Sequence, residues 1–120
     1  MNQTSTSKQY DLEKRTYDFG RNVLMLIVNL PKNSVNYKLT DQVIRSATSV
    51  GSNYLEANDS LGKKDFLMRM RIARKEAKET AYWLRLLFDF NVDFQKDLAG
   101  LIDECGQIKK ILSAITVKSE

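Results

Sequence analysis

An all-α fold, an antiparallel up-down-up-down four-helix bundle, is what this 120-residue sequence predicts. Apolar residues repeat at alternating steps of four and three along four segments, which is the spacing of a helix that buries one face. The chain has one Pro and five Gly, the composition of a helical domain and not of a turn-rich β-sandwich. The connections between the segments are short, which makes successive helices antiparallel neighbours.

The first predicted helix spans about residues 11–29 and ends before Pro31, because proline lacks an N–H donor and constrains the residue that precedes it. Its apolar face consists of Leu12, Thr16, Phe19, Val23, Leu26 and Leu30. We expect residues 1–9 to form a flexible N-terminal tail. Residues 10–117 should form one bundle domain, since a chain of this length buries a single core.

The second predicted helix ends near Asn58, and Thr40 or Asp41 lies near its start, where free N–H groups need an oxygen acceptor. The third spans about residues 63–90. The fourth carries the most regular series, although Gly100 and Gly106 each weaken it by ~1 kcal/mol relative to Ala. The apolar face of the second helix consists of Leu39, Val43, Ala47, Val50, Tyr54 and Ala57. That of the third consists of Phe66, Met70, Ala73, Ala77, Ala81, Leu84 and Phe88. That of the fourth consists of Phe94, Leu98, Leu101, Cys105, Ile108, Leu112 and Ile115.

Composition narrows the classes of function. Residues 1–8 lack the apolar core of a secretory signal, and no stretch approaches the ~18 apolar residues of a membrane span, so we expect a cytoplasmic protein with no membrane partner. Cys105 is the sole cysteine, which leaves no intrachain disulfide and no thiolate cluster for a metal. The sequence has no histidine, the commonest general base, and no Gly-rich phosphate loop. We expect a protein that is not an enzyme and uses no cofactor.

Two segments of the sequence resemble a known family. RSATSVGSNYLEA (45–57) and KKDFLMRMRIARKEAKETAYWLRLL (63–87), with a looser match in RTYDFGRNV (15–23), are similar to the bacterial four-helix-bundle proteins encoded in intervening sequences of 23S rRNA genes. The resemblance implies a homopentameric ring of bundles. Similar basic proteins serve as accessory factors of diversity-generating retroelements, so the resemblance also implies RNA, DNA or a reverse transcriptase as a partner.

The third predicted helix carries the excess positive charge of the chain. The formal net charge is +4, and residues 62–86 alone hold eight basic and three acidic side chains. Arg71, Arg74 and Lys78 have no acidic residue three or four positions away, so no pair within the helix neutralises them. We name the whole set the basic row: Lys64, Arg71, Arg74, Lys75, Lys78 and Arg85.

The basic row predicts salt-sensitive contacts to the phosphates of RNA or DNA, with little sequence readout. The alternatives are a face that is only solvated, or one neutralised across the bundle by Asp97, Asp103 and Glu104 of the fourth helix.

A second apolar strip lies outside the main faces. Contiguous apolar patches are small on monomers, and Trp and Met are enriched at the centres of interfaces, so the strip predicts a subunit interface. The alternative is a wide core face on a long central helix. The strip consists of Met68, Ile72, Trp83 and Leu86 on the third helix and Ile44 and Leu55 on the second.

Polar residues form a further row on the second helix. Arg45, Ser49, Asn53 and Glu56 are expected to form a network with Glu76 and Glu79 of the third helix. Such networks hold helices or subunits in register, and the alternative is a ligand site. The sequence as a whole predicts a non-catalytic oligomer that binds RNA or DNA through the basic row. The alternative function is a protein–protein scaffold or accessory subunit that does not itself bind nucleic acid.

Overall fold

The computed structural model consists of four long α-helices and one short 3-10 helix. It describes residues 3–120, and side chains from Leu12 onward. The helices are α1 (Gln3–Ile27), α2 (Ser34–Asn58), α3 (Lys63–Phe90) and α4 (Gln95–Ser119), and the 3-10 helix η1 (Val92–Phe94) leads into α4. Over the described residues, no helix is long and apolar enough to cross a membrane.

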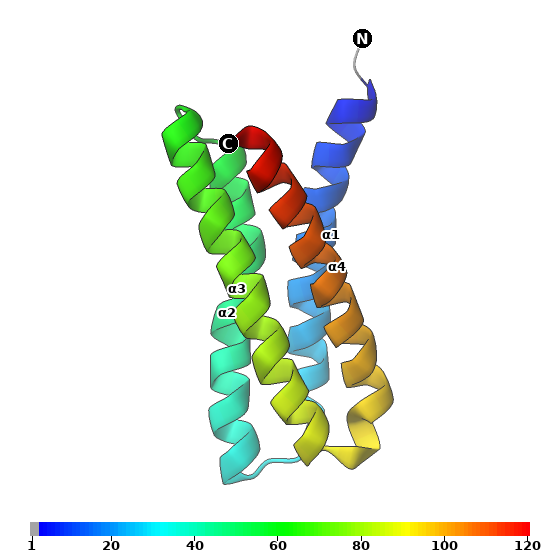
Figure 1. The fold of residues 1–120 in the computed structure, drawn as a ribbon. Helices are drawn as coiled ribbons and strands as arrows, with labels where there is room; N and C mark the ends of the chain where they lie inside the picture. Colours follow the sequence, from blue (N-terminus) through cyan, green and yellow to red (C-terminus); the bar gives the residue numbers. More distant parts are fainter. Residues whose placement is uncertain (1–2) are drawn as a thin grey trace.

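The four helices alternate in direction around one core (Figure 1). The α1–α2 and α3–α4 connections lie at one end of the molecule and the α2–α3 connection at the other. Each helix contacts two neighbours, and the α2–α3 contact is the most extensive while the α1–α4 contact is the least. The bundle measures 49 × 25 × 19 Å. The predicted fold, an all-α up-down-up-down bundle, is therefore confirmed.

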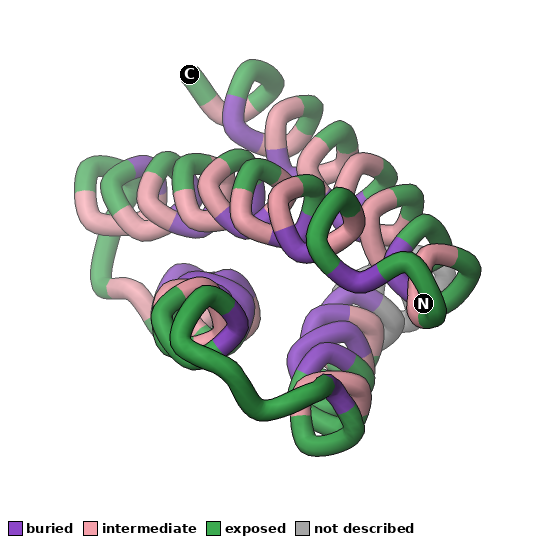
Figure 2. Tube along the Cα trace, turned by 90° about the horizontal axis from the view of Figure 1, so that it is seen from below, coloured by how far each residue is buried: buried purple, intermediate pink, exposed green. Residues whose placement is uncertain are grey.

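The core forms where the predicted apolar faces meet. Figure 2 shows the buried positions of the helices turned toward the interior of the bundle. Ala47, Ala73 and Ala77 are completely buried. Because these side chains are small, α2 and α3 can approach closely, which accounts for the large α2–α3 contact. The largest fully buried side chains include Phe19, Met70, Leu84, Leu87, Leu98, Ile108 and Leu112.

The buried face of α3 is wider than its heptad spacing predicts. Leu67, Thr80 and Leu87 are buried in addition to Met70 and Leu84. The reason is that α3 lies between α2 and α4, so residues on both sides of its central seam are covered.

The first helix starts earlier than predicted. α1 begins at Gln3 instead of near Asp11, and the segment between them contains no Pro or Gly that would stop a helix. The predicted tail (1–9) is therefore helical from Gln3, and Met1 and Asn2 lie outside the described residues.

The predicted start of the second helix, at Thr40 or Asp41, is wrong. α2 begins at Ser34, because the side chain of Asn33 accepts a hydrogen bond from the backbone N–H of Asn36 at 2.9 Å and caps the helix. The connection between α1 and α2 consequently spans residues 28–33 and is shorter than the sequence indicates.

Candidate nucleic-acid interface

The basic row lies along the length of α3, and most of its side chains face solvent. Arg74 is half-buried and the other five cations are exposed. From Lys64 to Arg85 the row extends about 32 Å at a rise of 1.5 Å per residue. Phosphates follow one another every 3.4 Å along one strand of a duplex, so a row of this length spans several of them.

Arg71 is the one member of the basic row that forms an ion pair among the described residues. Its Nη2 lies 3.0 Å from Oε2 of Glu120, directly after α4. The neighbouring Lys63 donates to the backbone carbonyl of Glu120 at 2.8 Å. These contacts join the start of α3 to the end of α4. The other five cations of the row form no salt bridge within the part of the chain that the structure describes.

Neutralisation of the row by Asp97, Asp103 and Glu104 does not occur in the structure. Glu104 instead binds Arg15 of α1 in a bidentate pair, with Nε–Oε2 and Nη2–Oε1 distances of 2.7 and 2.8 Å. This pair joins α1 to α4, and the hydrogen bond that Arg15 donates to Glu104 raises the pKa of Arg15. Asp103 accepts a hydrogen bond from Gln107 on its own helix.

Arg45 of α2 connects that helix to α3 through two glutamates. Its Nη2 lies 2.6 Å from Oε1 of Glu79, and its Nη1 lies 3.8 Å from Oε1 of Glu76. Trp83 donates its indole N–H to the same Glu79 oxygen at 3.3 Å. The hydrogen bond from Trp83, and then the contact with Arg45, lower the pKa of Glu79. Three residues of the predicted polar network are thus brought together.

The remaining residues of that network form shorter-range contacts. Ser49 donates to the carbonyl of Arg45 at 2.7 Å, and Asn53 donates to the carbonyl of Ser49 at 2.9 Å. Asn53 also accepts from Nη1 of Arg69 at 3.2 Å, a partner on α3 that the sequence did not indicate. Glu56 is exposed. Most of the network therefore connects α2 with α3 or lies within α2.

The second apolar strip divides into exposed and half-buried members. Ile44, Leu55 and Met68 are exposed by 40–52%. Trp83 is half-buried and packs against the core cluster, as a wide core face would require. Ile72 and Leu86 are also half-buried.

A larger exposed apolar surface lies on the outer side of α1 and α2. We name it the α1–α2 apolar face. Its members are exposed by 37–78% and are Tyr17, Leu24 and Met25 on α1, Val28 directly after α1, and Tyr37, Ile44 and Leu55 on α2. Sequence reasoning identified only Ile44 and Leu55. The spacing of Tyr17, Leu24 and Val28, at i, i+7 and i+11, is a second helical stripe that could have revealed it.

A groove of roughly 380 Å³ runs through the α1–α2 apolar face. Gly20 and Gly51 are part of its lining, where α1 and α2 approach closely. A Cβ atom at position 51 would lie 3.3 Å from Oγ1 of Thr16, tighter than ordinary contact. Glycine at this position therefore permits the approach of the two helices.

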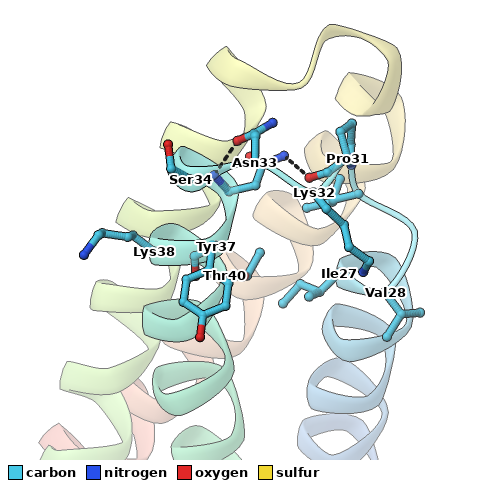
Figure 3. A pocket seen from close by; sticks show the side chains of 11 residues that line it. Ile27, Val28, Pro31, Lys32, Asn33, Ser34, Tyr37, Lys38 and Thr40 are labelled. Carbon is cyan, nitrogen blue, oxygen red and sulfur yellow. Dashed lines mark hydrogen bonds between the residues drawn. The ribbon is translucent and has the colours of Figure 1, made fainter.

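A second, more open pocket of roughly 680 Å³ lies at the α1–α2 connection (Figure 3). Asn36 donates to the carbonyl of Pro31 at 2.9 Å and fixes this connection. Asn36 and Asn91 also exchange side-chain hydrogen bonds of 2.8 and 2.9 Å, and both residues are buried. This amide pair ties the connection to the end of α3, where Asn91 also donates to the carbonyl of Leu87.

Cys105 is a buried residue of the α4 core face. Its thiol donates to the carbonyl of Ala77 at 3.1 Å, and burial raises its pKa to about 12. A thiol in this environment is protonated at neutral pH and is a poor nucleophile. Among the described residues, no group of three or more Cys, Asp or Glu side chains is arranged to hold a metal ion.

A family model and a solved structure each match most of the chain. A model of the 23S rRNA-intervening sequence protein family matches residues 8–114. A crystal structure of a protein of unknown function from the S23 ribosomal protein family of Bacteroides thetaiotaomicron is similar to the chain, with 28% sequence identity and a TM-score of 0.82. The match covers 91% of this chain and 97% of that one. No curated protein matches the chain.

Proposed function

The chain belongs to the 23S rRNA-intervening sequence protein family, and from this premise we propose that it is a non-catalytic, oligomeric, cytoplasmic protein that binds RNA or DNA through the basic row of α3. Binding is electrostatic and weakly sequence-selective, because lysine and arginine heads on one helix face meet phosphates and not base edges.

The observation that carries this proposal is the uncompensated charge of the basic row. Five cations on one side of α3 form no salt bridge within the described residues, although the chain contains 15 Asp and Glu residues, and of these five Lys75 interacts at longer range with Glu79. Glu104 of α4 is instead held by Arg15 of α1. A polyanion supplies the counter-charges that the fold does not.

The binding experiment compares two variants with the same net charge. The row variant combines Arg74→Gln, Lys78→Gln and Arg85→Gln; the control combines Lys38→Gln, Lys96→Gln and Lys110→Gln, which are exposed cations on α2 and α4. Each removes three charges and takes the formal net charge from +4 to +1. Arg71 is left intact because it holds Glu120.

We expect the wild type and the control to bind 23S rRNA fragments and unrelated RNA at low salt with similar affinities, and the row variant to bind at least tenfold more weakly, equivalent to ~1.4 kcal/mol. Equal losses in both variants would mean that only net charge matters. Unchanged binding in the row variant would eliminate this face, and an inert wild type would eliminate the function.

The α1–α2 apolar face supports the oligomeric part of the proposal. Seven large apolar side chains are exposed on one side of a small domain, and large exposed apolar patches mark sites of interaction. A homopentamer follows from the family resemblance and corresponds to a particle of about 69 kDa built from 13.8 kDa chains. Oligomerisation would join several basic rows and convert a weak contact into avidity if the rows face one ligand.

Light scattering after size exclusion tests the assembly. Leu55→Glu places a charge in the α1–α2 apolar face and should dissociate the oligomer; Val117→Glu, on exposed α4, is the matched control and should not. A wild-type monomer at every concentration would contradict the proposal, while a dimer would contradict only the pentamer.

The second candidate function is a protein–protein scaffold, which the groove in the α1–α2 apolar face favours. A groove lined by exposed apolar residues suits the apolar side of a partner helix, such as one from a reverse transcriptase. Partner capture that survives nuclease and moderate salt, and is lost in Leu24→Glu, would favour the scaffold over nucleic-acid binding.

A further inference from the structure

Tyr82 lies within the basic row. Its side chain is 57% exposed, and it follows Lys78 by four residues and precedes Arg85 by three. At about 100° per residue, both cations and Lys75 lie within about 60° of Tyr82 around the α3 axis. One exposed aromatic ring therefore lies among the cations on the outer side of α3.

The tyrosine ring is supported from one side. Its centroid lies 5.1 Å from that of Trp83, with the ring planes at 77°, an edge-to-face contact. Trp83 is itself fixed, because it packs against the core and its indole N–H donates to Glu79. An exposed aromatic side chain on a rigid helix with a fixed neighbour is a pre-organised surface for a flat ligand.

The charge around Tyr82 distinguishes it from other exposed tyrosines of the chain. Tyr17 is 70% exposed on α1, but one turn to either side of it stand an acid, Glu13, and a base, Arg21. Around Tyr82 the flanking positions Lys78 and Arg85 are cationic and form no salt bridge within the described part of the chain. The acid one turn away, Glu79, is held by Arg45 and by the indole N–H of Trp83. The unpaired cations beside the exposed ring of Tyr82 favour a negatively charged ligand that also carries an aromatic group.

We propose that Tyr82 stacks on an unpaired base while Lys78 and Arg85 bind the phosphates on either side, so that the ligand of the basic row is single-stranded nucleic acid or an unpaired loop. This rests on the proposed function and specifies its substrate class. A duplex keeps the faces of its bases inside its own stack and offers none to a tyrosine, whereas a single strand exposes them.

Fluorescence anisotropy with an unstructured RNA oligonucleotide, its DNA counterpart, and each strand annealed to its complement tests the proposal. The variants are Tyr82→Leu, which keeps an apolar side chain suited to a helix, and Tyr82→Phe, which keeps the ring; Tyr17→Leu is the control. Thermal melting and size exclusion verify that each variant keeps its fold and assembly.

We expect the wild type to prefer either single strand over its duplex. Tyr82→Leu should weaken single-strand binding by between about fivefold and a hundredfold, the range for loss of one stacked base. Tyr82→Phe and Tyr17→Leu should stay within about twofold of the wild type, because the first keeps the ring and the second lies outside the row. The salt dependence of Tyr82→Leu should match that of the wild type, because its cations remain.

Photo-crosslinking of wild-type protein to an oligonucleotide with 4-thiouridine gives a readout that needs no variant. Trypsin cleavage after Lys78 and Arg85 releases residues 79–85, and we expect the crosslink in this peptide. Wild-type binding with an unaffected Tyr82→Leu variant, or crosslinks confined to α1 and α2, would overturn the stacking proposal and leave the basic row in place. A wild type that binds neither single strand nor duplex would overturn the proposed function as well.

Discussion

Replacement of two glycines in α4 should stabilise the protein. Gly100 and Gly106 lie inside this helix, and a Cβ atom at either position would have no heavy atom of another element or distant side chain within 4 Å. Alanine at such a site gains ~1 kcal/mol over glycine, because glycine loses more backbone freedom when it becomes helical. Gly100→Ala and Gly106→Ala should each stabilise by about 0.5–1 kcal/mol, and together by about 1–2 kcal/mol.

Gly51 in α2 is the matched comparison. The same helix propensity would favour alanine there, but the added Cβ would lie 3.3 Å from Oγ1 and 3.4 Å from Cβ of Thr16. Thr16 is buried and its hydroxyl donates to the carbonyl of Leu12 at 2.9 Å, so it has little room to move. Overpacking of this kind costs about 1–3 kcal/mol. Gly51→Ala should therefore gain nothing and should destabilise the protein by up to about 2 kcal/mol.

Urea unfolding followed by circular dichroism measures all four variants at one protein concentration, since association contributes to apparent stability. We expect the free energy of unfolding to fall with urea concentration at the same slope in all variants. The urea midpoint should be higher for the α4 variants and lower for Gly51→Ala. A gain in Gly51→Ala as large as that in the α4 variants, or a loss of stability in the α4 variants, would contradict this difference between the two helices.

Three further predictions concern buried or shifted polar groups. Asn91→Leu leaves the Asn36 amide without its partner and should destabilise the bundle by about 2–4 kcal/mol in urea unfolding. The double variant with Asn36→Leu should lose less stability than the sum of the two single variants. Strictly additive losses would argue against the pair. Cys105 should react with a thiol reagent at neutral pH only as fast as the protein unfolds, because its thiol is buried and its pKa is about 12; immediate stoichiometric reaction of the folded protein would contradict its placement. Trp83 and Arg45 lower the pKa of Glu79. The contribution of Glu79 to stability is therefore present above the ordinary glutamate pKa of about 4.3 and is lost as the pH falls through the lower pKa of the folded state. Glu79→Gln should reduce the loss of stability in acid, and an unchanged loss would exclude this residue as its source.

The fold could be predicted because its determinants are local and periodic. The series from Phe94 to Ile115 follows a helical period without interruption, and Pro31 is unsuited to the interior of a helix. The start of α2 could not be predicted, because Asn33, Ser34, Thr40 and Asp41 are all competent caps and tertiary packing selects among them.

The candidate site could be predicted only in part. The basic row is visible in the sequence because its members share one helix. Whether each cation is neutralised depends on other helices, and the pairing of Arg71 with Glu120 joins positions that no local pattern connects. The α1–α2 apolar face was missed because Arg21 interrupts the stripe formed by Tyr17 and Leu24.

The salt dependence of binding is the most direct test of the claim that the basic row binds nucleic-acid phosphates. For each phosphate neutralised, the slope of log K against log[salt] should contribute about −0.7 for a single strand or −0.9 for B-DNA. The row variant (Arg74→Gln, Lys78→Gln and Arg85→Gln) should have a slope shallower by about two to three in either case, while the control variant (Lys38→Gln, Lys96→Gln and Lys110→Gln) should keep the wild-type slope. A wild-type affinity that does not change with salt, or equal slopes for the two triple variants, would contradict the account.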